Sequence, residues 1–325
     1  MTRPILVVGS INLDVVCEVA HIPRPGQTVM GRDVQLFHGG KGANQAMGIA
    51  RLGHPVRMAG RLGDDAAGTR LRAGLRAGGV DVRHVAATRR TPSGMALICT
   101  DRRGENSIVV SPGANARLTP LDIRPLTAVL RSCAMVLLQL EIPFETVDRV
   151  TVLAQRAGVP VMLDPAPARD LPASLLRRVT WLTPNESEAA HLCGGTATGT
   201  TTATTTMTRT AARAHAEALR ARGCGTAIIT LGRQGCCVAA GAARAYTVRA
   251  FRVRAVDSTA AGDAFNAGLA VALVRGTPLA DAVRYASAVA AVSVTRRGAQ
   301  PSMPTAGDVS RFLRQQAGRR RGAHR

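Results

Sequence analysis

Apolar residues recur along the chain with two different periods, and their alternation predicts the fold. Continuous apolar runs, such as PILVVGS at residues 4–10, are typical of buried strands in a parallel sheet. Segments with apolar residues three or four positions apart, such as residues 43–53, predict helices. After residue 118, helical and strand patterns alternate regularly, which indicates βαβ units. We therefore expect an α/β protein, a three-layer α/β/α sandwich with a mainly parallel central sheet.

The pattern also gives approximate positions for the elements of the second half. Strands are expected at 134–140, 159–164 and 226–232. Helices are expected near 120–132, 144–157, 208–222, 262–275, 278–295 and 305–317.

Two segments, 12–38 and 93–111, do not follow this alternation and consist of short strands and hairpins. We expect them to form a small β-sheet of their own that projects from the edge of the main sheet. The rest of the chain (1–11, 39–92 and 112–325) then forms one α/β domain. Within it, residues 194–208 are rich in threonine and too poor in apolar residues to pack, so we expect a flexible loop. Residues 318–325 form a basic tail.

The formal net charge of +21 raises nucleic-acid binding as a rival function. Against that function, the basic residues are scattered over helices and turns, and aromatic residues make up only 2% of the chain. Few side chains are therefore available to stack on the bases of a single strand. We do not expect nucleic acid to be a partner.

Other features of the sequence bear on its location. No apolar run approaches the roughly 18 to 20 residues that a membrane-spanning helix needs, and the chain opens without the features of a signal peptide. The seven cysteines form an odd set without a C-x-x-C pair, which is typical of reduced thiols. These features predict a cytoplasmic protein that does not enter the membrane.

The stretch VDSTAAGDAFNAGLAVAL, residues 256–273, is the strongest candidate for chemistry. It predicts a helix that begins at about Gly262, with free backbone N–H groups at residues 260–263 that suit a phosphate. The negative charge of Asp263 would repel a passively bound phosphate, but it suits a base that takes a proton from an attacking hydroxyl. Alternatively, Asp263 only stabilises the first turn of the helix. The stretch alone leaves both interpretations open.

Lys41 is the only lysine of the chain and lies in the glycine-rich segment FHGGKGANQA, residues 37–46. This segment lacks the spacing and the Ser or Thr of a P-loop. Its position is either chance, or a compact ammonium group is needed at a site in which a guanidinium group would not fit. The segment alone leaves both interpretations open.

Six motifs resemble those of the ribokinase-like (PfkB) carbohydrate kinases in order and spacing. They are GSINLDVV, GGKGANQAMGIARLG, DPAPARDLP, TPNESEA, ITLGRQG and VDSTAAGDAFNAG, and the similarity extends from about residue 5 to 315. The resemblance is strongest to the members that phosphorylate ribose. It implies an enzyme, an ATP-dependent sugar kinase, whose α/β domain binds nucleotide and substrate. The small β-sheet of residues 12–38 and 93–111 would be a lid that closes over the sugar and pairs with a second copy to form a homodimer.

The resemblance also implies roles for individual residues. Asp263 would be the base that activates the sugar hydroxyl, and the backbone amides of Ala260, Ala261 and Gly262 would form the anion hole. Many relatives have Gly-Ala-Gly-Asp where this chain has Ala-Ala-Gly-Asp. The sugar-binding residues would be Asn12, Asp14, Gly40, Lys41, Asn44, Glu141 and Asp263. A site of this kind rejects analogues that lack a hydroxyl, because its own polar groups would be left unpaired.

For the nucleotide and the cations, the resemblance implies three further groups of residues. Asn185, Thr230, Gly232 and Gly235 would bind the nucleotide. Glu188 and Asn185 would hold Mg²⁺ through water, next to the phosphates of ATP. A potassium ion, acting as a monovalent activator, would be bound mostly by backbone carbonyl groups of Asp257, Thr259, Ser293, Arg296, Gly298 and Ser302.

The expected reaction is phosphorylation of D-ribose at its 5-hydroxyl by ATP, giving ribose 5-phosphate and ADP. One alternative is a kinase of the same fold that acts on another sugar, on deoxyribose or on a nucleoside. The second is a basic nucleic-acid-binding or regulatory protein that keeps the kinase fold without turnover. The presence of Asp263, Asn185 and Glu188 argues against the second alternative.

Overall fold

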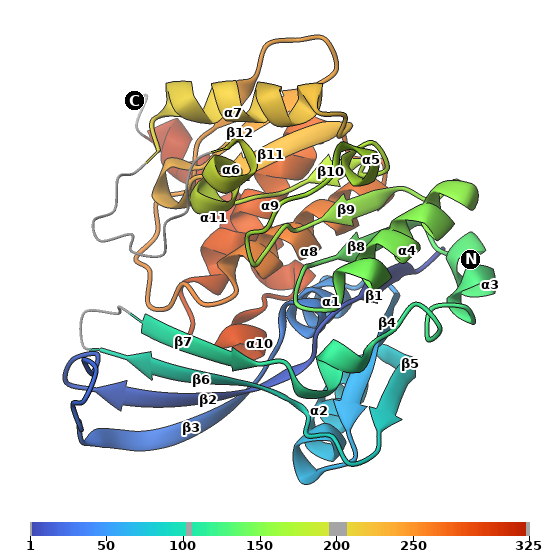
Figure 1. The fold of residues 1–325 in the computed structure, drawn as a ribbon. Helices are drawn as coiled ribbons and strands as arrows, with labels where there is room; N and C mark the ends of the chain where they lie inside the picture. The colour runs from blue at the N-terminus through green and yellow to red at the C-terminus, as the bar shows by residue number, and fades with distance from the viewer. Residues whose placement is uncertain (1, 102–105, 195–206, 323–325) are drawn as a thin grey trace.

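A nine-stranded sheet forms the centre of the molecule in the computed structural model, which describes residues 2–101, 106–194 and 207–322 and no side chains beyond residue 318 (Figure 1). Its strand order is β13-β12-β11-β10-β9-β8-β1-β4-β5. The strands from β5 to β11 run parallel, whereas β12 and β13 are antiparallel to their neighbours. The strands are β1 (Ile5–Val8), β4 (Val56–Gly63), β5 (Asp81–Thr88), β8 (Met135–Leu138), β9 (Val161–Leu163), β10 (Trp181–Leu182), β11 (Thr226–Thr230), β12 (Cys236–Ala240) and β13 (Tyr246–Val248).

Helices cover both faces of this sheet, so the predicted three-layer α/β/α sandwich is confirmed (Figure 1). One face packs against α1 (Lys41–Arg51), α2 (Ala66–Ala77), α8 (Ala261–Val274), α9 (Leu279–Ser293) and α11 (Ala306–Gly322). The other face packs against α3 (Leu126–Arg131), α4 (Phe144–Arg156), α5 (Ala173–Leu176), α6 (Glu186–Leu192) and α7 (Arg209–Ala221). The short α10 (Ala299–Ser302) lies beside α1, and two 3₁₀ turns, η1 (Gly113–Arg117) and η2 (Gly232–Gln234), complete the helical elements.

Strand β1 shows why the apolar runs of this sequence are continuous. Ile5 and Val7 belong to the core on the α8 side of the sheet, and Leu6 and Val8 belong to the core on the α4 side. All four side chains are fully buried. A strand covered on both faces has no position for a polar side chain, so its sequence does not alternate.

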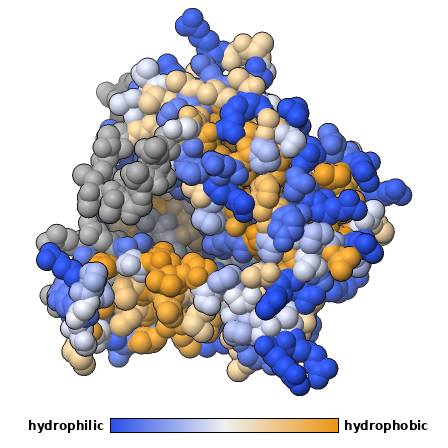
Figure 2. Space-filling model, viewed as in Figure 1, coloured by the Kyte–Doolittle hydropathy of each residue, from blue (hydrophilic) through white to orange (hydrophobic). Residues whose placement is uncertain are grey.

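A separate four-stranded sheet projects from the edge of the sandwich, in the order β3-β2-β6-β7 (Figure 1). Its strands are β2 (Asn12–Val19), β3 (Gly31–Gly39), β6 (Gly94–Thr100) and β7 (Asn106–Ser111). Directly paired residues share a face, which places Leu36, Leu97 and Val109 together on the face opposite Asp14. These three side chains are exposed, and Figure 2 shows apolar side chains gathered over this sheet.

The structure differs from the predicted elements at three places. Strand β5 was not predicted, because its sequence DVRHVAAT mixes charged and small residues. Helix α3 begins only at Leu126, since Pro120 and Pro125 precede it and proline interrupts a helix. Helix α11 continues to Gly322, into the predicted basic tail. Most of the predicted Thr-rich loop, residues 195–206, lies outside the described residues. None of the described helices combines the length and the apolar character needed to cross a bilayer.

Candidate active site

A cleft of about 700 Å³ opens at the carboxyl ends of the central strands. Its walls come from the loops that follow β9, β10 and β11, from the first residue of α1, and from the first turns of α6 and α8. In parallel α/β sheets ligands bind at this edge, outside the carboxyl ends of the strands. Nine of the predicted site residues line the cleft: Lys41, Asn185, Glu188, Thr230, Gly232, Ala260, Ala261, Gly262 and Asp263.

Helix α8 begins in the cleft without a side-chain cap. Its N-cap residue, Ala260, has left-handed backbone angles, φ 58° and ψ 19°. Among the described residues, the N–H groups of Ala260, Gly262 and Asp263 have no acceptor. The expectation of four free amides was wrong for Ala261, whose N–H donates to the Ser258 carbonyl at 3.2 Å. The helix start therefore offers three open donors and one weakly engaged donor to an anion.

The carboxylate of Asp263 lies in the first turn of this helix and is 4% exposed. Its two oxygens accept hydrogen bonds from α1, Oδ2 from Nδ2 of Asn44 at 2.9 Å and Oδ1 from Nε2 of Gln45 at 3.1 Å. Burial raises the pKa of Asp263, and the Lys41 ammonium and these two hydrogen bonds offset part of that rise. A carboxylate whose pKa is raised toward the working pH is suited to accept a proton.

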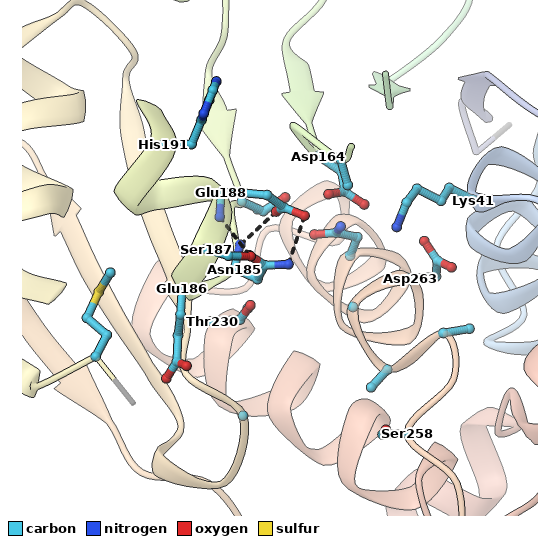
Figure 3. Close-up of a pocket in the computed structure, with 18 of the residues that line it drawn as sticks. Lys41, Asp164, Asn185, Glu186, Ser187, Glu188, His191, Thr230, Ser258 and Asp263 are labelled. Carbon is cyan, nitrogen blue, oxygen red and sulfur yellow. Dashed lines mark hydrogen bonds between the residues drawn. The ribbon is translucent and has the colours of Figure 1, made fainter. Parts of the chain in front are cut away.

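Lys41 is partly buried and faces several carboxylates, two of which, Asp164 and Asp263, lie beside it on the same side of the cleft (Figure 3). Burial alone would lower the pKa of Lys41, but Asp164, Asp263, Glu141 and Glu188 together raise it. The only lysine of the chain is therefore a permanent cation among carboxylates.

The remaining predicted sugar residues lie next to this group. Glu141 accepts hydrogen bonds through Oε2 from the Ser10 hydroxyl at 2.5 Å and the Lys41 N–H at 3.2 Å. Burial, with Glu141 and Asp263 nearby, raises the pKa of Asp14 to about 7. Asn12 is buried at the start of β2, where its Oδ1 accepts from Nδ2 of Asn115 at 2.7 Å.

Two observations at this group fit a polyhydroxyl ligand. The buried Oδ1 of Asn44 has no hydrogen-bond partner among the described residues. Gly40 has φ +87°, and a Cβ there would lie within 3 Å of the backbone of Ser10, Ile11 and Asn12. The glycine thus brings two backbone segments together beside Lys41, and the unpaired Asn44 oxygen is free to accept a hydroxyl.

On the opposite wall of the cleft, Asn185 and Glu188 form a capping box at the start of α6 (Figure 3). Asn185 Oδ1 accepts from the Glu188 N–H at 2.9 Å, and Glu188 accepts from the N–H and Nδ2 of Asn185, both at 2.8 Å. Burial raises the pKa of Glu188, while the Asn185 N–H and Lys41 lower it. Glu188 thus has a structural role in the helix as well as a position in the cleft.

No cluster of three or more His, Cys, Asp or Glu side chains that could hold a metal is found in the part of the chain that the structure describes. Magnesium fits the cleft nonetheless, because it retains several waters and needs only one or two protein oxygens. Glu188 and Asn185 supply such oxygens beside Thr230 and Gly232, which form the end of β11 and the turn after it. Gly235 does not line the cleft. Its φ of +102° closes that turn, where the Leu231 N–H donates to the Gly235 carbonyl.

The six residues predicted to bind potassium lie in two segments, the loop before α8 and the stretch from the end of α9 to the end of α10, and Asp257 joins these segments. Asp257 accepts from the Thr259 N–H at 2.9 Å and from the Gly298 N–H at 2.8 Å. The Arg296 guanidinium pairs with Asp308 at 3.0 Å, which leaves its carbonyl as the group available in the loop. Ser293 and Ser302 are buried at the ends of α9 and α10. These segments offer carbonyl and carboxylate oxygens as metal ligands, a set that suits an alkali cation. Asp257 lies three residues before Ala260, the N-cap of α8.

Several residues of the site were missed in the sequence. Asp164, 6% exposed, follows β9 and lines the cleft beside Lys41. Gln45 and Gln139 are buried, and Asn266 lines the cleft with an Oδ1 that has no hydrogen-bond partner among the described residues. His191 also lines the cleft. Asp164 stands in the motif DPAPAR, a signal that could have identified it, whereas nothing in the sequence links the two glutamines.

Comparisons with known proteins agree with this geometry. Residues 2–306 match the pfkB family carbohydrate kinases. The chain is 40% identical over 311 residues to the ribokinase of Bacillus subtilis and 37% identical over 313 residues to that of Haemophilus influenzae, covering 96% of this chain and 99% of each relative. The structure of Arabidopsis thaliana ribokinase complexed with ribose and ATP matches with a TM-score of 0.87 and 32% identity, over 96% of this chain and 99% of that one.

Proposed function

The chain belongs to the pfkB family of carbohydrate kinases, and from this premise we propose that it catalyses the ribokinase reaction, in which ATP phosphorylates D-ribose at the 5-hydroxyl. The observation that carries the proposal is the pairing of one buried carboxylate, Asp263, with the open amides of the same helix start. A proton acceptor and open amides in the same first turn of α8, beside a group of polar side chains, suit the transfer of a phosphoryl group to a sugar hydroxyl.

In the proposed mechanism Asp263 takes the proton of the 5-hydroxyl as the hydroxyl oxygen attacks the terminal phosphorus of ATP. The bond from that phosphorus to the bridging oxygen breaks, and ADP leaves. The amides of Ala260, Ala261 and Gly262 stabilise the charge on the transferring phosphoryl group. Catalysis consists of positioning and charge stabilisation, because the protein forms no covalent bond. The lid formed by 12–38 and 93–111 excludes water, which would otherwise compete as an acceptor.

We assign the sugar to Asn12, Asp14, Gly40, Lys41, Asn44, Glu141 and Asp263, which surround the point where β2, α1 and α8 meet. The carboxylates accept hydroxyl hydrogens, and Lys41 donates to sugar oxygens. We expect Lys41→Arg to raise the KM for ribose by about tenfold or more and to change the KM for ATP little, because a guanidinium needs more room than an ammonium group. Equal changes in the two KM values would contradict the assignment of Lys41 to the sugar.

We assign the nucleotide to Asn185, Thr230, Gly232 and, through the turn it closes, Gly235. Glu188 and Asn185 would hold Mg²⁺ through water, and the bound ion supplies positive charge to the phosphates of ATP. Asp257, Thr259, Ser293, Arg296, Gly298 and Ser302 would hold K⁺, which supplies a fixed positive charge beside the loop before α8. Both cation assignments rest on the oxygen donors described above.

The exposed apolar face of the small sheet supports a homodimer formed through the lid. Leu36, Leu97 and Val109 are 43%, 50% and 63% exposed on the face that points away from Asp14. A row of exposed apolar side chains on a sheet marks an interaction surface. We propose the cytoplasm as the compartment, which agrees with seven free cysteines.

The test is a coupled ADP-release assay with Mg²⁺ and ATP on a panel of pentoses, deoxyribose, hexoses and nucleosides, in potassium and in sodium. Preference for ribose with stimulation by potassium supports the acceptor and the cation site together. Activity on another acceptor would support the kinase activity but contradict ribose as the substrate. Absence of turnover on every acceptor, combined with steeply salt-dependent binding of nucleic acid, would contradict the kinase and favour a non-catalytic basic protein.

A further inference from the structure

Behind the cleft, two buried glutamines connect α1 and the end of β8 to the carboxylate of Asp263. Gln45 is 1% exposed and Gln139 is fully buried, and neither lines the cleft. Nε2 of Gln45 donates to Asp263 Oδ1 at 3.1 Å and to Asp164 Oδ2 at 3.0 Å. Its Oε1 accepts from Nε2 of Gln139 at 2.6 Å. The amide of Gln45 therefore uses both of its hydrogens on carboxylates and its oxygen on a second amide.

This arrangement permits only one orientation of the Gln45 amide. Carboxylates accept hydrogen bonds and do not donate when ionised, so the nitrogen must face Asp164 and Asp263. A flipped amide would bring its oxygen against both carboxylates and its nitrogen against Nε2 of Gln139. Gln139 is itself confined, because a Cβ at Gly9 would lie 2.0 Å from its Oε1.

Gln45 and its neighbour Asn44 together fix the plane of the Asp263 carboxylate. Asn44 donates to Oδ2 and Gln45 donates to Oδ1, so each oxygen is held from successive residues of one helix. We assign Asn44 also to the sugar, through its unpaired Oδ1, whereas the amide of Gln45 has all its hydrogen bonds to other protein groups and acts through Asp263.

We propose that Gln45 is a positioning residue for phosphoryl transfer, whose amide holds the Asp263 carboxylate in the orientation that takes the proton of the sugar hydroxyl, and that Gln139 fixes this amide. The inference rests on the proposed function. The charged groups that face Asp263 are Lys41 from α1, Glu141 from the loop after β8, Asp164 from the loop after β9, Glu188 from α6 and Asp14 from β2.

The central experiment compares Gln45→Met, which keeps the length of the side chain and removes its donors, with the wild type. We expect kcat to fall about 10- to 100-fold with both KM values nearly unchanged, because a misplaced base costs turnover and not binding. The acidic limb of the kcat–pH profile should move up by about one pH unit, since a hydrogen bond to the ionised form is lost. Thr146→Val is the matched control, a buried hydroxyl bonded to the Leu118 carbonyl away from the cleft, and should leave the profile unchanged.

A double-mutant cycle separates positioning from a general loss of structure. In the Asp263→Asn background, Gln45→Met should reduce the residual kcat by less than about twofold, because the group through which Gln45 acts is already gone. Equal losses in the two backgrounds would overturn the proposal, and so would an unchanged pH profile. Gln139→Met should give the same upward shift of the acidic limb at a smaller loss of kcat, and it decides the question if Gln45→Met fails to fold.

A measurement without turnover distinguishes this inference from the reaction on which it rests. The pKa of Asp263 is followed by ¹³C NMR of carboxyl-labelled aspartate, with its resonance identified by its loss in Asp263→Asn. A higher pKa in Gln45→Met supports the positioning role whichever acceptor the enzyme uses, and an equal pKa contradicts it. If ribose is not phosphorylated in the acceptor panel, the identity of the sugar changes, but the positioning role of Gln45 is not affected.

Discussion

Helices α6 and α8 both begin at the cleft, but the two helix starts are built in opposite ways. At α6, Asn185 and Glu188 satisfy each other in a capping box. At α8 no side chain caps the helix, Ala260 is left-handed, and three of the first four N–H groups have no acceptor among the described residues. The capping box stabilises the start of α6, whereas the start of α8 leaves these N–H groups open and holds Ala260 in an unfavourable backbone conformation, at a cost in stability. Only the start of α8 therefore has the open donors that our proposed anion hole requires.

The largest effect is expected from Asp263→Asn. This change keeps the shape of the side chain and removes the proton acceptor, so kcat should fall by about 10²- to 10⁴-fold with little change in the unfolding midpoint. Turnover is measured with the acceptor that the assay identifies, and unfolding is followed by circular dichroism.

A matched control addresses the alternative that Asp263 merely stabilises the first turn of its helix. Asp281 occupies the first turn of α9 and is exposed outside the cleft. Asp281→Asn should lower stability by less than about 1 kcal/mol and leave kcat unchanged. Near-normal kcat in Asp263→Asn, with a loss of stability like that of Asp281→Asn, would return Asp263 to a helix-capping role.

The second prediction extends the comparison to Asp14, one of the carboxylates that we assign to the sugar. The pKa of Asp14 rises from 3.8 to about 7 in the folded protein because burial and its neighbours Glu141 and Asp263 disfavour the charge. The folded state thus binds this proton more tightly, so the stability that Asp14 contributes is full below pH 4 and is lost as pH rises to about 7. Asp14→Asn should therefore raise the free energy of unfolding at pH 8, by at most about 4 kcal/mol, with no gain near pH 3.

Urea denaturation at several pH values measures this difference. In the wild type we expect the KM for ribose to rise below pH 7, because the ionised carboxylate accepts a hydrogen bond from a sugar hydroxyl. Asp14→Asn should raise the KM for ribose at neutral pH and abolish this rise at lower pH. A variant that is less stable than the wild type at pH 8 would show that the buried Asp14 carboxylate does not destabilise the folded protein.

The third prediction concerns the start of α6, which the capping box of Asn185 and Glu188 stabilises. Asn185→Ala removes the cap of α6 and should lower the free energy of unfolding by about 1 kcal/mol. Thr208 caps α7 in the same way, accepting from the Ala211 N–H at 3.2 Å, and does not line the cleft. Thr208→Ala should cost a similar amount of stability, while only Asn185→Ala should raise the KM for ATP. Equal KM values in the two variants would limit Asn185 to capping.

The difference between the two helix starts also shows what the sequence could predict. Apolar runs and helical periods predicted the sandwich, because burial on both faces of a sheet requires them. The segment around Asp263 was found because an acidic residue after small residues is unusual at a phosphate site. The amide of Gln45 was not found, since it connects residues that are 94, 119 and 218 positions away along the chain. Its hydrogen bonds arise from the packing of α1 against the sheet and α8.

The smallest effect is expected at Ala260, the residue that makes the start of α8 costly. A left-handed conformation costs a non-glycine residue about 1–2 kcal/mol, and glycine loses part of that advantage through the entropy of the unfolded chain. Ala260→Gly should therefore stabilise the protein by about 0.5 kcal/mol and leave kcat within about twofold, because the amide keeps its position. Ala261→Gly, in the helical first turn, should instead destabilise it by a similar amount. Stabilisation by both substitutions, or by neither, would mean that the backbone at Ala260 carries no strain and that the open start of α8 costs the folded protein nothing.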